Sequence, residues 1–209
     1  MTPRDEEIVT LLCFAVRFFA LEQVARTWWS DQPREIRRAR KRMLTLARNG
    51  WVRPLTILAR PLLKLESPIF EWRPGSLDPE VPCVSRKLQS RWKQPARDVE
   101  IFLATPRATA VMGGGAPGSV TNLCQTTHDL HVAEVFLFYR ENRPQLASLW
   151  VGEDSIIQRS EHEKRPDAVL LNGSREILRV VEFGGAYKPG RVQAFHDFCL
   201  KRNLSYELW

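Results

Sequence analysis

The stretch PREIRRARKRMLTLARNG, residues 33–50, is the segment that says most about the fold. Its apolar residues recur at intervals of three and four, the spacing of one helix face: Ile36, Ala39, Met43 and Leu46. Pro33 suits the first turn of a helix, and Asn49-Gly50 suits the C-terminal end. The sequence therefore predicts an amphipathic helix over residues 33–49.

Basic side chains line the other side of this helix. The chain carries 31 Lys and Arg against 24 Asp and Glu, a net charge of +7, and residues 1–75 contribute +6 of it (14 basic, 8 acidic). Such a concentration favours a polyanionic partner, here double-stranded DNA, although a solvated basic surface is the alternative. The expected DNA contacts are Arg34, Arg37, Arg38, Lys41, Arg42, Arg48 and Arg53.

The neighbouring segments complete a recognisable order of elements. Helical periodicity predicts a helix over 4–19 and a short one over 21–29. After Gly50, residues 51–58 and 62–72 read as two strands of a hairpin. Three helices followed by a hairpin are typical of a winged helix-turn-helix domain, whose third helix enters the major groove. We assign this domain to residues 1–75.

The rest of the chain predicts a second unit. Residues 76–97, rich in proline, read as a linker around a short basic helix at 85–92, and 98–209 read as one domain. Its expected elements are a strand at 99–104, a helix at 129–141, a strand at 147–151, a hairpin across 165–182, a helix at 189–203 and a strand at 206–209. The predicted fold class is α+β in two domains, the second with a mixed α/β core.

Two carboxylates frame the predicted hairpin. Asp167 opens its first strand, Glu182 ends its second, and Asn172-Gly173 forms its turn. Pairing Leu171 with Glu176 would make the two acids diagonal neighbours, about 7 Å apart. Carboxylates so placed can share Mg²⁺, with Mn²⁺ as a substitute, and such a metal can activate water for phosphodiester hydrolysis. Ordinary surface acids at strand ends are the alternative.

Pro166-Asp167, then Glu182 fifteen residues later at the end of an apolar strand, resembles the PD-(D/E)xK nuclease superfamily with its restriction-endonuclease fold. With the winged helix, the chain resembles the replication-relaxation family of plasmid and mobile-element proteins, which shares a helix containing His128-x-x-His131. The resemblance implies a Mg²⁺-dependent DNA endonuclease with Asp167 and Glu182 as catalytic metal ligands and Glu134 as an accessory acid.

The sequence departs from the superfamily motif at the lysine two residues after the glutamate, where it has Gly184. Lys188, or Arg191 on the following helix, could replace that lysine. The alternative is an inactive, DNA-binding accessory or regulatory protein acting in replication, mobilisation or transcription. A protein scaffold that binds no nucleic acid is a third hypothesis, and a homodimer is compatible with all three.

Two further features concern metals and location. His128, His131 and Glu134 share a helix face, so a zinc cluster completed by His162 or His196 is conceivable, but histidines that pack against a helix are commoner. The four cysteines are far apart, which argues against a disulfide framework. No apolar run reaches the roughly 18–20 residues of a membrane helix. We expect a cytoplasmic protein with no membrane contact.

Overall fold

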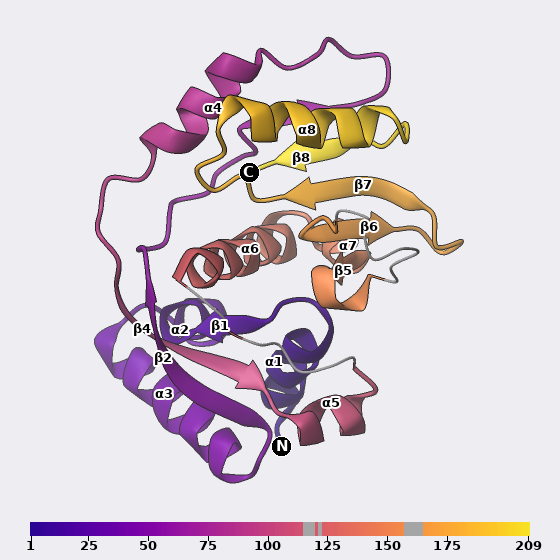
Figure 1. Cartoon of the computed structure of the whole chain (residues 1–209). Coiled ribbons are helices and arrows are strands. Elements are labelled where there is room, and N and C mark those ends of the chain that lie inside the picture. Colours follow the sequence, from indigo (N-terminus) through magenta and orange to yellow (C-terminus); the bar gives the residue numbers. More distant parts are fainter. Residues whose placement is uncertain (115–119, 121–122, 157–164) are drawn as a thin grey trace.

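The computed structural model describes residues 1–114, 120, 123–156 and 165–209, and shows a mixed α+β architecture of stacked layers (Figure 1). A three-stranded sheet and a five-stranded sheet lie on either side of a long central helix, α6 (Leu123–Asn142). Helix α3 (Pro33–Arg48) covers the outer side of the smaller sheet, and α8 (Pro189–Leu200) with α4 (Val81–Ser90) covers the outer side of the larger one.

The first sheet has the strand order β1-β4-β2 (Phe18–Ala20, Arg97–Ala104 and Val52–Ala59), all antiparallel. Around it lie α1 (Pro3–Phe14), α2 (Leu21–Trp28) and α3. The predicted apolar face of α3 is confirmed, because Ala39, Met43 and Leu46 are buried. Thr2 and Asp5 form a capping box that begins α1, so the helix starts at residue 3.

The predicted hairpin between residues 51–58 and 62–72 is wrong. Strand β2 pairs with β4, from Val52 opposite Ala104 to Ala59 opposite Arg97. After β2 the chain leaves the sheet because its backbone binds α6 instead: the Arg60 amide donates to Thr127 Oγ1 and the Leu63 amide to His131 Nε2. Strand β4, which the sequence assigned to the second domain, is therefore the central strand of the first sheet.

The segment between β2 and β4 crosses to the other sheet. It contributes β3 (Phe70–Trp72), which pairs with β8 (Tyr206–Leu208), and then α4, which packs against α8. Val84 and Leu88 of α4 are buried in the core beneath α8. The helix expected at 85–92 thus exists, begins at residue 81, and is packed on the second sheet, where the sequence suggested a linker.

The second sheet has the order β3-β8-β7-β6-β5, with β5 at Trp150–Gly152, β6 at Ala168–Leu171 and β7 at Ile177–Glu182. Strands β7 and β8 are parallel and the other pairs are antiparallel, so the predicted hairpin across 165–182 is confirmed. The remaining elements are α5 (Pro106–Met112), α7 (Pro144–Ala147) and a 3₁₀ turn at Glu153–Ser155.

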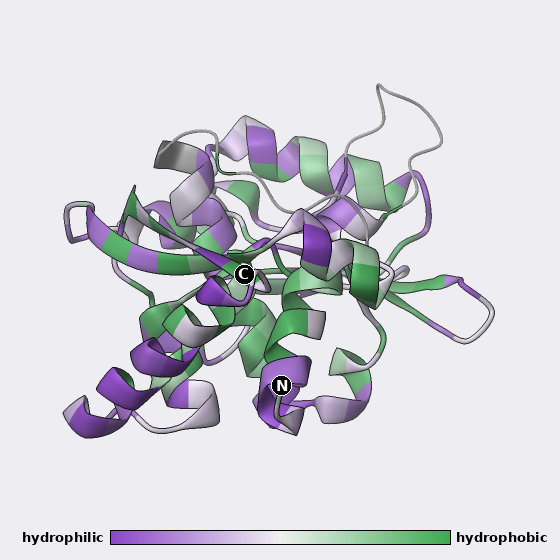
Figure 2. Ribbon diagram, turned by 90° about the horizontal axis from the view of Figure 1, so that it is seen from below, coloured by the Kyte–Doolittle hydropathy of each residue, from purple (hydrophilic) through white to green (hydrophobic). Residues whose placement is uncertain are grey.

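A continuous core joins the two sheets. It includes Leu12 of α1, Phe102 of β4, Phe136 of α6 and Val181 of β7. Figure 2 shows hydrophobic segments of the ribbon gathered towards the middle of the molecule. Helix α6 therefore serves as a layer for both sheets, and the division into two domains stays a prediction. Among the described residues, no helix is long and apolar enough to cross a membrane.

Candidate functional site

The exposed surface of α3 carries the basic residues expected to contact DNA. Arg34, Arg37, Arg38 and Lys41 follow one another at i, i+3, i+4 and i+7, and all four side chains are exposed. Arg38 bonds Glu35 one turn earlier at 2.7 Å, in a pair open to solvent. Within the described part of the chain, Arg34, Arg37 and Lys41 form no ion pair. Their charges are available to an external anion.

Arg42 differs from the other predicted DNA contacts. Its guanidinium binds both carboxylate oxygens of Asp5, a side chain only 1% exposed, and so fastens α3 to α1. Burial disfavours the Asp5 carboxylate, but hydrogen bonds from Arg42 and Thr2 outweigh it and lower the Asp5 pKa to about 2. Arg48 and Arg53 are exposed, beside the turn from α3 into β2.

Asp167 and Glu182 lie side by side at the same end of β6 and β7. Ala168 is opposite Val181, so the residues just beyond them, Asp167 and Glu182, face each other directly. The diagonal arrangement that the sequence suggested is wrong, because the register shifts between Leu170 and Leu171. Both acids are buried, at 8% and 1% exposed. The two residues are thus direct cross-strand neighbours rather than the diagonal ones that the predicted register implied.

The Asp167 carboxylate has a donor at each oxygen. His128 Nε2 lies 2.7 Å from Oδ1, and the Phe183 backbone amide donates to Oδ2 at 2.6 Å. Burial opposes protonation of His128, but the charge and hydrogen bond of Asp167 outweigh it and raise the His128 pKa to about 9. At neutral pH His128 is therefore an imidazolium, and its positive charge lies beside the buried Asp167 side chain.

Glu182 has a phenol as its partner. Tyr187, in the loop between β7 and α8, donates its hydroxyl to Glu182 Oε1 at 2.5 Å. Burial and the neighbouring carboxylates raise the pKa of Tyr187 far above its usual range, so the hydroxyl keeps its proton. Arg191, on α8, hydrogen-bonds Tyr187 and lies 5.0 Å from the centre of its ring. Of the two predicted substitutes for the lysine, Arg191 thus reaches this network through Tyr187.

The arrangement suits a divalent cation poorly. Each of the two carboxylates already accepts a hydrogen bond from a side chain, and Asp167 accepts a second from the backbone. In the described ranges, no three His, Cys, Asp or Glu side chains are grouped so that they could hold a metal ion. Mg²⁺ prefers oxygen ligands, and two carboxylates could supply them. However, the cation would have to compete with His128 for the Asp167 carboxylate.

Glu134 and Lys188 are not among the residues that contact the Asp167 and Glu182 carboxylates. Glu134 accepts hydrogen bonds from Gln23 and Arg26 of α2, so it ties α6 to α2. Lys188 precedes α8, is exposed, and among the described residues has no carboxylate partner. The predicted accessory acid and the predicted lysine substitute are therefore not brought into contact with Asp167.

His131 is a structural histidine. Its Nδ1 donates to the Thr127 carbonyl at 2.7 Å, its Nε2 accepts from the Leu63 amide at 3.1 Å, and its ring stacks on Phe183. Burial lowers its pKa to about 4, so it stays neutral. Both nitrogens are occupied, which contradicts the conceivable zinc cluster with His128 and Glu134. His196 contacts Tyr206 and Asp78 instead, and His162 lies outside the described residues.

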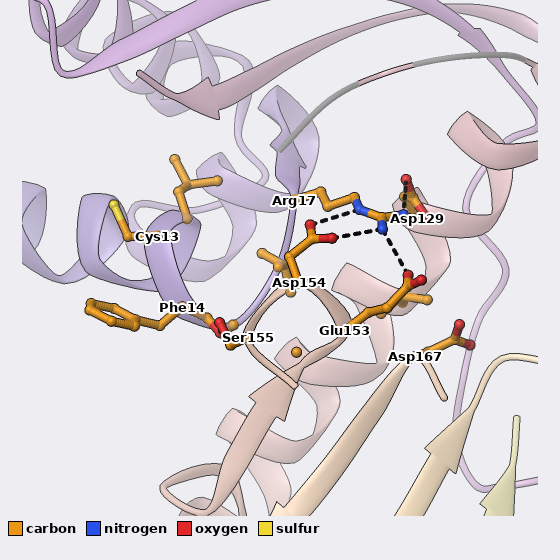
Figure 3. Close-up of a pocket in the computed structure, with 13 residues that line it drawn as sticks. Cys13, Phe14, Arg17, Asp129, Glu153, Asp154, Ser155 and Asp167 are labelled. Atoms are coloured by element: carbon orange, nitrogen blue, oxygen red, sulfur yellow. Dashed lines mark hydrogen bonds and ion pairs between the residues drawn. The ribbon is translucent and has the colours of Figure 1, made fainter. Parts of the chain in front are cut away.

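A cluster around Arg17 adjoins this site, and no local sequence pattern indicates it. Figure 3 shows the Arg17 guanidinium directed at three acids, and Asp167 lying beside Glu153. Arg17 bonds Asp129 of α6 at 3.2 Å, Glu153 at 2.9 Å and Asp154 at 2.8 Å. Burial raises the Asp129 pKa to about 6 although Arg17 opposes this. Because its partners come from distant segments, only the tertiary fold reveals the cluster.

Comparison with models of known protein families finds no match to this chain. Comparisons with curated proteins and with solved structures also find none.

Proposed function

We propose that this protein binds double-stranded DNA through α3, as a winged helix-turn-helix, and that the site at Asp167 and Glu182 does not cleave DNA. The observation that carries the proposal is the exposed row Arg34, Arg37, Lys41, whose charges no carboxylate of the described chain neutralises. Duplex DNA presents a regular array of phosphates, and lysine and arginine that neutralise them release counterions.

The elements around α3 support this geometry. Helix α2 and the short connection at 29–32 precede α3, which is the order of a helix-turn-helix. The antiparallel pair β2 and β4 would take the place of the wing, although β3 and α4 separate its two strands in the sequence. Arg40 bonds Glu100 of β4 at 2.8 Å, and Arg42 bonds Asp5 of α1, so two charges hold the helix in place. The first turns of a recognition helix face base edges, which assigns base contacts to Arg34 and Arg37.

The second sheet bears on both parts of the proposal. Its architecture supports the resemblance to the restriction-endonuclease fold, and the contacts of its two acids support the lack of cleavage. It is one mixed sheet with a helix on each face, and it carries Asp167 and Glu182 at neighbouring strand ends. However, the acids are bonded to His128, the Phe183 amide and Tyr187. A Mg²⁺-dependent endonuclease remains the second candidate function, favoured by the adjacency of the two acids.

Duplex binding is tested by fluorescence anisotropy over a range of salt concentrations, with the Arg37→Ala/Lys41→Ala double variant. We expect weaker affinity and a salt dependence of the binding constant that is flatter by about one unit per lost phosphate contact. Arg86→Ala/Lys87→Ala removes the same charge from the exposed side of α4 and serves as the control. Equal losses in both double variants would overturn the assignment of α3.

Cleavage is tested by incubating supercoiled plasmid with the wild-type protein and Mg²⁺ or Mn²⁺. We expect no nicking. Nicking by the wild type that Asp167→Ala abolishes would establish the endonuclease instead.

A further inference from the structure

A cavity of about 790 Å³ opens beside His128, and it shares no lining residue with the pocket around Arg17. Four segments build it: the residue after β2, the end of α4 with the turn that follows, the start of α6, and the loop between β7 and α8. This volume lies within the range of about 300–1,000 Å³ that is usual for small-molecule and cofactor sites.

The charged side chains that line the cavity are all cationic. Arg60 and Lys188 contribute cationic groups, and both side chains are exposed. Neither has a carboxylate partner among the residues that the structure describes. The carboxylates of Asp167 and Glu182 do not line the cavity; His128 and Tyr187, which bond them, form its wall instead. An anion in the cavity therefore meets two unneutralised cations and no acid.

The rest of the lining includes two aromatic rings, those of Trp92 and Phe183. Trp92 donates its indole N–H to the Gly185 carbonyl at 3.0 Å and contacts His131 and Phe183 edge to face. Its ring is half-buried, and the Arg60 guanidinium lies 5.6 Å from its centre. A ring fixed in this way offers a stacking surface at little cost in conformational entropy, and a planar base is the group that uses it best.

We propose that this cavity binds a nucleotide, with the base against Trp92 and the phosphate between Arg60 and Lys188. The nucleotide is either free or an unpaired nucleotide within a single strand; the recognised chemistry is the same for both. The site includes no residue of α3, so the proposal does not depend on whether α3 binds duplex DNA.

The ligand class is tested by calorimetry and tryptophan fluorescence on the full chain, with dAMP, deoxyadenosine, inorganic phosphate and a ten-residue oligo(dT). We expect dAMP or the oligonucleotide to bind at least tenfold more tightly than deoxyadenosine or phosphate. Binding of dAMP alone identifies a free nucleotide as the source, and binding of the oligonucleotide alone identifies a strand. Equal affinity for phosphate and dAMP, or no binding by any of the four, would overturn the proposal.

Variants locate the site. Arg60→Ala and Lys188→Ala should each weaken binding of the tighter ligand two- to fivefold, about the contribution of an exposed charge pair. Lys201→Ala, at the other end of α8, removes an exposed lysine and should leave it unchanged. Trp92→Leu should weaken binding about tenfold. If Trp92→Leu does not fold, the two charge variants still test the location. Binding by Arg60→Ala and Lys188→Ala that is no weaker than binding by Lys201→Ala would contradict it.

Discussion

Gly184 lies against Leu88 so closely that any side chain at position 184 would force the Leu88 side chain to move. A Cβ built there would lie 2.9 Å from both Leu88 methyl carbons and 3.0 Å from a methyl carbon of Leu208. Helix α4 thus occupies the space into which a side chain at the motif's lysine position would point. The glycine thus allows α4 to pack closely on the second sheet, and a lysine placed there would have to displace Leu88.

Gly184→Lys should therefore destabilise the protein without creating nuclease activity. Overpacking costs about 1–3 kcal/mol, which urea denaturation measures, and Leu88→Ala in the same chain should relieve the clash, so that the two costs are less than additive. Gly173→Lys is the control, because a Cβ at 173 meets nothing within 4 Å. Equal stability of Gly184→Lys and the control would refute the packing explanation.

The Asp5–Arg42 pair should make folding sensitive to acid. The folded-state pKa of Asp5, about 2, lies below its ordinary value of 3.8, so its stabilisation is fully present above pH 4 and disappears as the pH falls towards 2. Asp5→Asn should be less stable than the wild type at pH 6, and the difference should shrink at pH 2.5. Thermal melts at the two pH values measure it, and a constant difference would contradict the pair's role.

His128 and His131 should titrate on opposite sides of neutrality, with pKa values of about 9 and 4. A raised pKa means that the stabilisation from His128 is fully present below pH 6.5 and is lost as the pH rises through 9. Long-range ¹H–¹⁵N NMR should show His128 doubly protonated and His131 neutral at pH 7. Asp167→Asn should lower the pKa of His128; an unchanged value would rule out Asp167 as the cause.

Replacing Arg17 should leave its three acids uncompensated. We expect Arg17→Met to cost about 3 kcal/mol of stability at pH 7.5, because breaking a partly buried ion network strands its charges. The cost should fall at pH 5, since Asp129, with a pKa of about 6, then becomes neutral. Arg26→Met, at a more exposed pair with Glu134, is the comparison. A cost that grows on acidification would argue against this account.

The features predicted correctly are those that local sequence determines. The apolar period of 33–48 and the Asn172-Gly173 turn act over a few residues, so α3 and the β6–β7 hairpin follow from them. The strand that pairs with β2 is β4, which follows only after β3 and α4. The apolar run at 62–72 lies nearer in the sequence and is the more obvious pairing partner. The facing of Asp167 and Glu182 depends on a register shift, and the bond from His128 depends on how α6 lies over the sheet. Neither leaves a local signal.

The path of residues 60–96 has a consequence for how the chain could be inherited or cut. The backbone leaves the first sheet after β2, joins the second as β3 and α4, and returns as β4 to the centre of the first. Neither sheet is therefore encoded by one continuous stretch, and neither can pass to another protein as a single cassette. A protease that cleaved the backbone between β3 and β4 would leave two pieces that each contribute strands to both sheets and so remain held together.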